Sequence, residues 1–214
     1  MKNKKVIYTC ILNKKDRLKE EFPKIQGYDY ICFTDDPNLK SKLWEIRPFK
    51  NSLNDFRKSS RLPKMLPHKY LPEYDIWVWV DGRVVINDIR EFNEAVVACT
   101  GLSLPAHPHR DCVYDEAEYC VKQHLGNTQK LAFQVIKYKM ENYPFHNGLY
   151  MCGFIIRKNN KEVRTFNRAW WAEYCEVSER DQLSFPYVIW KTKFSFSILP
   201  ITMIKVLVLR GVTL

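Results

Sequence analysis

The sequence predicts a single α/β domain. Its 214 residues are enough for one sizeable domain with a core, and a content of 46% hydrophobic and 14% aromatic residues excludes a disordered chain. Short apolar runs typical of buried strands alternate with segments of helical spacing, as in an α/β sheet. No Gly- or Ser-rich linker interrupts the first hundred residues, so one domain is expected there and not two.

The first half of the chain predicts four strands and one interrupted helix. The strands are expected at residues 5–12, 28–35, 43–48 and 76–80, the last being the most apolar. Residues 56–70 have helical spacing, although Pro63 and Pro67 should kink or split the helix. Its cations recur at helical intervals and would form one basic stripe, composed of Arg57, Arg61, Lys64 and His68. The stripe is either a solvated helix face or a surface that holds a diphosphate.

Asp81 and Gly82 follow the strand at 76–80 directly, and Arg83 comes next. A carboxylate at the carboxyl end of a buried strand lies at the rim where open α/β sheets bind ligands, and glycine leaves room for one. Asp35 stands at the end of the strand at 28–35, where it would contact a ribose or base, or form an Asx-turn before Pro37. For Asp81 the alternative is an ordinary turn between two strands.

The second half predicts helices at 89–99, after residue 112, at 127–142, around 163–174 and after residue 179, with strands at 102–106 and 149–157. Gly153 in the last strand allows a close approach to its backbone. The most polar loop contains four candidate contacts, namely His107, His109, Arg110 and Glu116. Metal binding by the two histidines and contact with a substrate both remain open, but no third metal ligand stands at a recognisable spacing.

The formal net charge of +10 suits an anionic partner such as a nucleotide-sugar, an acidic glycan, a nucleic acid or a membrane surface. The seven cysteines form no Cys-x-x-Cys pair, so the spacing indicates neither a zinc site nor a disulfide framework. Free thiols in a reducing cytosol are expected. The start of the chain lacks a signal-peptide core, and no apolar run is long enough to span a bilayer. We therefore expect a cytoplasmic protein, with the inner membrane face as a further candidate location.

Several function classes lack their motifs. The sequence contains no GxGxxG, GxxxxGK[ST] or GxSxG string. A Rossmann dehydrogenase, a P-loop nucleotidase and an α/β-hydrolase are therefore not supported. Its basic residues are spread along the chain without a nucleic-acid-binding motif, so nucleic acid is not an expected partner.

Three strings occur together in this order: SSRLPKMLPHKYLPEYDIWVWVDGRVVI at 59–86, AHPHRDCVYDEAE at 106–118 and RDQLSF at 180–185. Together they resemble the glycosyltransferase-like domains of the TOD/MUCI type, found in plant Golgi proteins and bacterial polysaccharide loci. The resemblance covers about residues 5–198, and residues 199–214 depart from it as a divergent or truncated tail. It implies a GT-A-like domain at 1–198, built on a mixed, mainly parallel central sheet flanked by helices.

The order of motifs is also similar to that of glycogenin-like transferases, which have an Asp-x-Asp strand end, a strand near Asn-x-Gly and an Asp-Gln pair. The corresponding positions here are 81–83, 151–153 and 181–182, with two departures. Arg83 replaces the second aspartate and Met151 replaces the asparagine. The resemblance implies Mn²⁺ or Mg²⁺ at Asp81. The missing carboxylate leaves open that Arg83 or another cation supplies the positive charge instead.

The resemblance implies a glycosyltransferase that moves a sugar from a nucleotide-sugar to a glycan, polysaccharide or lipid-linked glycan, with weak preference for retention of configuration. Asp181 and Gln182 would be catalytic. The expected substrate-binding residues are Asp35, Arg57, Arg61, Lys64, Arg83, His107, His109, Arg110, Glu116 and Gly153. Two alternatives remain: a non-catalytic GT-A-like module that binds glycan or nucleotide, and a basic nucleic-acid-binding or scaffold protein.

Overall fold

The strands of the central sheet are short and largely buried, as expected from their β-branched and aromatic residues. In the computed structural model, which describes residues 3–19 and 22–206, they are β1 (Lys5–Ile11), β2 (Asp29–Thr34), β3 (Glu45–Pro48), β4 (Ile76–Val80), β6 (Leu102–Pro105), β7 (Phe154–Lys158) and β8 (Ser197–Leu199). Their order across the sheet is β3-β2-β1-β4-β7-β6-β8.

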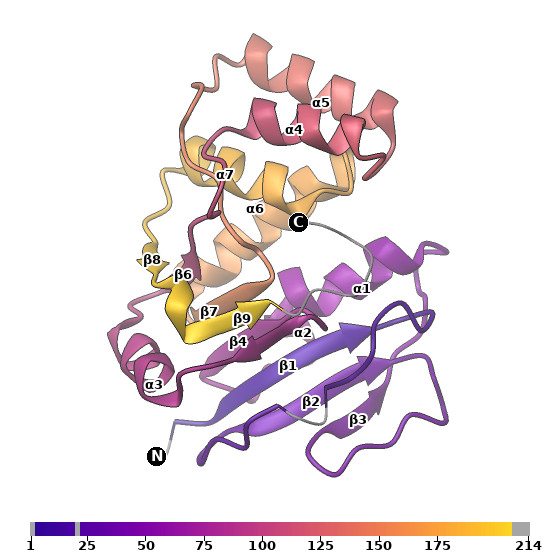
Figure 1. The fold of residues 1–214 in the computed structure, drawn as a ribbon, viewed down its shortest axis with the longest axis vertical. Coiled ribbons are helices and arrows are strands. Elements are labelled where there is room, and N and C mark those ends of the chain that lie inside the picture. The colour runs from indigo at the N-terminus through magenta and orange to yellow at the C-terminus, as the bar shows by residue number, and fades with distance from the viewer. Residues whose placement is uncertain (1–2, 20–21, 207–214) are drawn as a thin grey trace.

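Most pairs in this sheet are parallel. β1 pairs in parallel with β2 and β4, β2 with β3, and β6 with β8, whereas β7 runs antiparallel to β4 and β6. The predicted fold class is therefore confirmed: a single α/β domain with a mixed, mainly parallel sheet flanked by helices (Figure 1).

Helices cover both faces of the sheet (Figure 1). They are α1 (Phe56–Met65), α2 (Pro67–Tyr70), α3 (Ile89–Ala98), α4 (Val113–Lys122), α5 (Thr128–Met140), α6 (Lys161–Glu176) and α7 (Asp181–Thr192). The side chains of β4 alternate between two cores. Trp77 and Trp79 pack with α1, α6 and α7, and Val78 packs with Phe92 of α3 on the opposite face. β4 is thus buried on both sides, as its apolar run predicted.

The helix predicted at 56–70 is split. α1 ends at Met65, Leu66 has non-helical dihedral angles, and α2 begins with Pro67 at its first position. Proline suits that position because the first turn of a helix leaves its backbone N–H groups without partners.

The strand predicted at 149–157 is wrong in its first five residues, because β7 begins at Phe154. Leu149–Met151 instead extend the pairing with β6: Met151 donates its backbone N–H to Pro105 at 2.9 Å, and Tyr150 forms a bridge with Ala106. A turn at Cys152 and Gly153 then brings the chain against the end of β4.

The chain continues to form structure beyond residue 198. A short 3-10 helix, η1 (Ile201–Met203), is followed by β9 (Ile204–Val206), which pairs antiparallel with β5 (Val84–Ile86). The segment just after Asp81 is therefore covered by residues of the expected tail, while the tail's last eight residues lie outside the described part of the chain.

Candidate active site

The site lies at the rim where β1 and β4 end, next to the first residue of α7. Asp81 directly follows β4, and its backbone N–H donates to the carbonyl of Gly153 at 2.8 Å. A Cβ atom on Gly153 would lie 3.2 Å from Oδ2 of Asp81. The glycine therefore lets the turn before β7 lie directly against this carboxylate.

Lys64 lies between two carboxylates that are far apart in the sequence. Its side chain is fully buried, and its ammonium lies 2.6 Å from Oδ2 of Asp181 and 3.3 Å from Oδ1 of Asp81. Trp79 donates its indole N–H to the same oxygen of Asp81 at 2.6 Å. Both carboxylates are therefore held by charge-assisted hydrogen bonds from buried groups.

Asp181 also contacts Arg61, whose Nε lies 3.3 Å from Oδ2. Burial alone would raise the pKa of Asp181, but the Lys64 ammonium and the Arg61 guanidinium outweigh burial and hold this pKa well below its usual range. Asp181 is consequently an anion at neutral pH. It can stabilise positive charge or orient a substrate, but it has no proton to give as a general acid.

A fully buried arginine, Arg157, holds the backbone of Lys64 in place. Arg157 of β7 donates to the backbone carbonyl of Lys64 at 2.6 Å, to the hydroxyl of Tyr8 at 2.9 Å and to the amide oxygen of Asn167 at 3.1 Å. These bonds fix the last turn of α1 relative to β1, β7 and α6, and with it the Lys64 side chain.

Three further cations lie near residues of this cluster: Lys15 and Arg57 near Arg61, and Arg83 near Asp16. None of them has a carboxylate of the described residues within 4.0 Å. Partial burial lowers the pKa of Lys15, and the nearby charges of Arg57 and Arg61 lower it further. Such mutual repulsion among cations marks a place where an anion would be stabilised.

Asp16 supplies a second carboxylate next to Asp81. A Cβ atom on Gly82 would lie 2.7 Å from Cβ of Asp16, so the loop after β1 lies directly against the turn after β4. Burial raises the pKa of Asp16, the charge of Asp81 raises it further, and Arg83 opposes both effects.

A second charged cluster adjoins the first through Arg180, the residue before Asp181. Glu116 is 2% exposed, and its carboxylate lies 2.6 Å from Nε of Arg110 and 3.5 Å from Nη2 of Arg180. The Arg110 guanidinium also lies 4.0 Å from the ring centre of Tyr119. The two clusters form a continuous row of charges from Arg110 to Asp81.

The family model described as TOD1/MUCI70, glycosyltransferase-like domain, matches residues 32–213. The chain belongs to this family. A probable hexosyltransferase of Arabidopsis thaliana, MUCI70, is 25% identical over 165 residues, which cover 72% of this chain and 28% of the plant protein. The chain thus spans little more than a quarter of that relative's length.

His107 adjoins the Glu116 cluster of this TOD1/MUCI70 domain. Its Nδ1 accepts the backbone N–H groups of Arg110 at 3.0 Å and His109 at 3.2 Å. Burial is the main cause that lowers the pKa of His107. The neutral ring therefore has its proton on Nε2, which lies 3.5 Å from Nη2 of Arg110, so both N–H groups can donate to one ligand oxygen. His109 is exposed, and the described residues give this pair no third metal ligand.

Three residues singled out from the sequence make no side-chain hydrogen bond with the described residues of the Lys64 cluster. The Asp35 carboxylate accepts the backbone N–H of Asn13 at 2.9 Å and ties the ends of β1 and β2 together. The basic stripe does not extend to His68, because the helix breaks at Leu66; burial and the charges of α6 and of neighbouring residues lower the pKa of His68 to about 4. The side-chain amide of Gln182 makes no hydrogen bond to a described residue, although its backbone N–H donates to Asp181 at 3.1 Å.

The donor set at Asp81 does not fit a divalent ion shared with Asp181. Oδ1 of Asp81 is occupied by Trp79 and Lys64, and Oδ2 of Asp181 is occupied by Lys64 and Arg61. An ion at Oδ2 of Asp81 would have Asp16 as its nearest candidate for a second carboxylate, since Arg83 stands at the usual position. The cation between Asp81 and Asp181 is the ammonium of Lys64.

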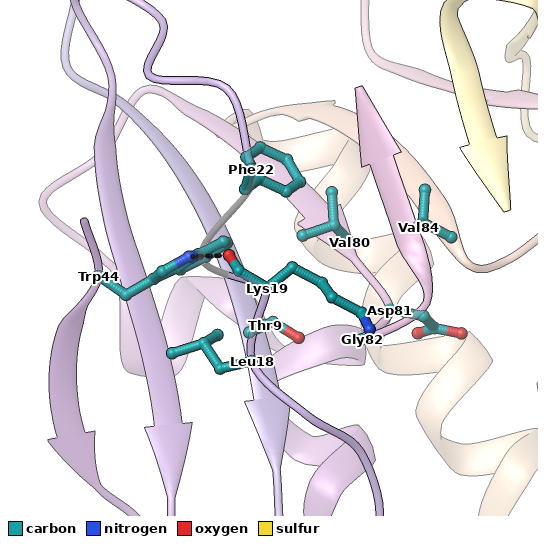
Figure 2. A pocket seen from close by; sticks show the side chains of 9 residues that line it. All are labelled: Thr9, Leu18, Lys19, Phe22, Trp44, Val80, Asp81, Gly82 and Val84. Atoms are coloured by element: carbon teal, nitrogen blue, oxygen red, sulfur yellow. Dashed lines mark hydrogen bonds between the residues drawn. The ribbon is translucent and has the colours of Figure 1, made fainter. Parts of the chain in front are cut away.

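A small hollow opens beside the site, between the loop after β1 and the end of β4 (Figure 2). It holds about 200 Å³, including space open to solvent, and Phe22, Trp44 and Gly82 are among its lining residues. The buried hydroxyl of Thr9 lines it without a hydrogen-bond partner among the described residues. In Figure 2 the Lys19 side chain runs across the hollow toward Asp81.

Sequence reasoning missed Lys15, Asp16, Arg157 and Arg180. Lys15 and Asp16 follow the carboxyl end of β1, which meets the same rim as that of β4. Two signals could have found the others: Arg157 is a charged residue at the end of an apolar run, and Arg180 directly precedes the predicted Asp-Gln pair.

Proposed function

We propose that this domain transfers a hexose from a nucleotide-sugar to a glycan acceptor. Membership in a glycosyltransferase-like family and the relative named a probable hexosyltransferase support this class of reaction. The single observation that carries the proposal is the fully buried Lys64, which joins Asp81 to Asp181. The cations Lys15, Arg57 and Arg83, which have no carboxylate of the described residues within 4.0 Å, add to it.

The chemistry follows from charge. Breaking the bond between sugar and diphosphate leaves negative charge on the nucleoside diphosphate, while the sugar becomes oxocarbenium-like. Lys15, Arg57 and Arg83 would bind the diphosphate oxygens, and Arg61 would reach them from α1. These positive groups stabilise the charge that grows on the leaving group, which is the interaction that accelerates the step.

We assign the carboxylate side of the site to the sugar. Asp181, held ionised by Lys64 and Arg61, would stabilise positive charge near the anomeric carbon or accept hydrogen bonds from sugar hydroxyls. The next residue, Gln182, would bind the same hydroxyls through its side-chain amide, which has no hydrogen-bond partner in the described part of the chain. On the side of Arg110 and Glu116, the Nε2–H of His107 would donate to the acceptor. Retention of configuration stays a prediction from the resemblance.

Lys64 supplies the charge that a divalent ion would otherwise supply between the two aspartates. We therefore expect nucleotide-sugar binding that does not depend on Mn²⁺ or Mg²⁺, with an ion at Asp81 and Asp16 as the opposing prediction. The membrane face as a location also stays a prediction; among the described residues, no helix combines the length and apolarity needed to cross a bilayer.

A donor screen tests the proposal. The full chain is incubated with UDP-, GDP-, CMP- and TDP-sugars, with EDTA or with Mn²⁺, and the melting temperature and the release of nucleoside diphosphate are measured. We expect one donor class to raise the melting temperature in EDTA and to be turned over. Binding without turnover, in the presence of glycan acceptors, would favour the non-catalytic module, for which the replacement of the second aspartate by Arg83 is the supporting observation. Binding of DNA or RNA that weakens steeply with salt, without any donor binding, would favour the nucleic-acid alternative.

A further inference from the structure

A separate group of side chains lies between two loops that frame the acceptor side. The sulfur of Cys112, a carboxylate oxygen of Asp115 and a ring nitrogen of His146 all lie within 4.8 Å of one another. Cys112 caps the start of α4 and is fully buried, whereas Asp115 and His146 are exposed. One thiol, one carboxylate and one imidazole converge here from segments about thirty residues apart.

Asp111 orients the imidazole of this group. Its carboxylate oxygen lies 2.8 Å from Nδ1 of His146. That bond leaves Nε2 as the ring nitrogen for another partner, and a carboxylate that holds one nitrogen while the other binds a metal is the usual arrangement at histidine ligands. His146 also has a positive φ of 51°, a backbone conformation that is uncommon for a residue other than glycine.

The two segments are already fixed relative to each other by contacts that need no metal. The hydroxyl of Tyr114 donates to the carbonyl of Tyr143 at 2.7 Å, and the Tyr114 ring lies 4.4 Å from the ring of Phe145, measured between ring centres. The ligand atoms therefore stay close together in the folded chain, and little loop closure is left for an ion to drive.

We propose that Cys112, Asp115 and His146 form a binding site for a Zn²⁺-class cation, distinct from the donor site. Sulfur, nitrogen and oxygen ligands at these positions match the preferences of zinc, with a fourth position left for water. Binding breaks the S–H bond of Cys112, forms the S–metal bond and releases the proton to solvent. The ion would lock the loop that carries His107 and Arg110 to the loop before β7. This site could not be predicted from the sequence, because Cys-x-x-Asp and a histidine thirty-one residues later match no recognised metal-ligand spacing.

The test uses the full chain, stripped with a chelator and titrated with Co²⁺ and then Zn²⁺ alone, without any donor. We expect one equivalent of Co²⁺ to bind with the near-ultraviolet absorption of a thiolate–cobalt bond, and Zn²⁺ to displace it and raise the melting temperature. His146→Asn is the main variant, because asparagine tolerates the positive φ and the side chain is 62% exposed. It should weaken Co²⁺ binding at least tenfold, and Asp111→Asn by about tenfold, the range for groups that orient a ligand.

Two controls separate this site from others. Cys175→Ser removes the exposed thiol and should leave the cobalt absorption unchanged, whereas Cys112→Ser should abolish it. Asp81→Asn should also leave it unchanged, so a failure of the proposed transferase reaction does not affect this result. Absence of the thiolate–cobalt absorption in the wild-type chain, or Co²⁺ affinity equal in wild type and His146→Asn, would overturn the proposal whether or not Cys112→Ser folds.

Discussion

The ammonium of Lys64 lies 2.6 Å from the carboxylate of Asp181, although 117 residues separate the two positions in the chain. This bond joins the last turn of α1 to the first residue of α7, while the second contact of Lys64 joins α1 to the end of β4. One buried cation thus sets the relative positions of both carboxylates at the candidate active site.

We expect Lys64→Met to lower the free energy of unfolding at pH 7 by about 3–5 kcal/mol, because it leaves two carboxylates facing each other without the buried cation. Asp181 has a lowered pKa in the folded wild type, so its stabilising effect is present above the unfolded pKa and is lost only as pH falls through the folded value. In Lys64→Met that effect is reduced, and the difference between variant and wild type should shrink below about pH 4, where free carboxyl groups become protonated.

Urea unfolding at pH 7 and at pH 3.5 measures both effects. Lys69→Met is the matched control, since Lys69 is the exposed residue of α2 and forms no ion pair with a described residue; it should change stability by no more than about 0.5 kcal/mol. Equal stability of Lys64→Met and Lys69→Met would show that the buried ion pairs contribute nothing to the fold.

The sequence located Lys64 but not its surroundings. Helical spacing placed Arg57, Arg61 and Lys64 on one face of α1, and the strand end at Asp81 was recognisable from its apolar run. Spacing within a helix does not reveal which distant element covers that face, so the contact of Lys64 with Asp181 of α7 could not be predicted. The unbroken apolar run of β4 was sufficient to predict the two-sided core, since that pattern is local.

Asp16 illustrates what local patterns leave out. It lies in an irregular loop, and its approach to Asp81 depends on the absence of a side chain at Gly82, sixty-six positions later. Gly148 and the positive φ of His146 similarly shape the loop before β7, where a strand was predicted to begin. In each case the conformation is decided by a long-range contact or a left-handed residue, which a two-residue alternation cannot encode.

Arg57→Ala and Arg61→Ala should each weaken binding of the nucleotide-sugar by about 1–3 kcal/mol, the range for a charge-assisted contact. Isothermal calorimetry in EDTA measures this. Arg61→Ala should also destabilise the chain, because Arg61 contacts Asp181, whereas Arg57→Ala should not, because Arg57 has no ion-pair partner among the described residues. The control is Arg168→Ala on α6, whose guanidinium contacts Thr165. Donor affinities equal to that of Arg168→Ala would show that Arg57 and Arg61 do not bind the donor and only form a solvated helix face.

Asp16→Asn should stabilise the unliganded chain at neutral pH by roughly 1–2 °C in melting temperature, the shift given by roughly 0.5 kcal/mol in a chain of this size. The sign follows from the raised pKa of Asp16: the folded state holds its proton more tightly, so stability falls as pH rises from the unfolded pKa through the folded one. The asparagine removes that loss, and partial exposure to solvent keeps the effect small. A melting temperature that falls at pH 7 and not at pH 3 would show that ionised Asp16 is stabilising, which contradicts the repulsion from Asp81.

The close contact between Gly153 and Asp81 gives the sharpest test of the site's geometry. A Cβ atom at residue 153 would lie 3.2 Å from Oδ2 of Asp81 and 3.5 Å from Cγ2 of Val84, and Trp79 holds the other oxygen of the carboxylate at 2.6 Å. The carboxylate has little freedom to move away, so Gly153→Ala should displace it by a few tenths of an ångström. We expect turnover to fall by roughly tenfold or more, since small misplacements of reacting groups are costly, with a change in unfolding free energy within about 1 kcal/mol.

Gly101→Ala is the matched control, because a Cβ atom there meets only Cγ2 of Val163 at 3.6 Å, an ordinary contact. Steady-state turnover and urea unfolding of both variants decide the matter: full activity in Gly153→Ala would show that the position of the Asp81 carboxylate does not limit the reaction.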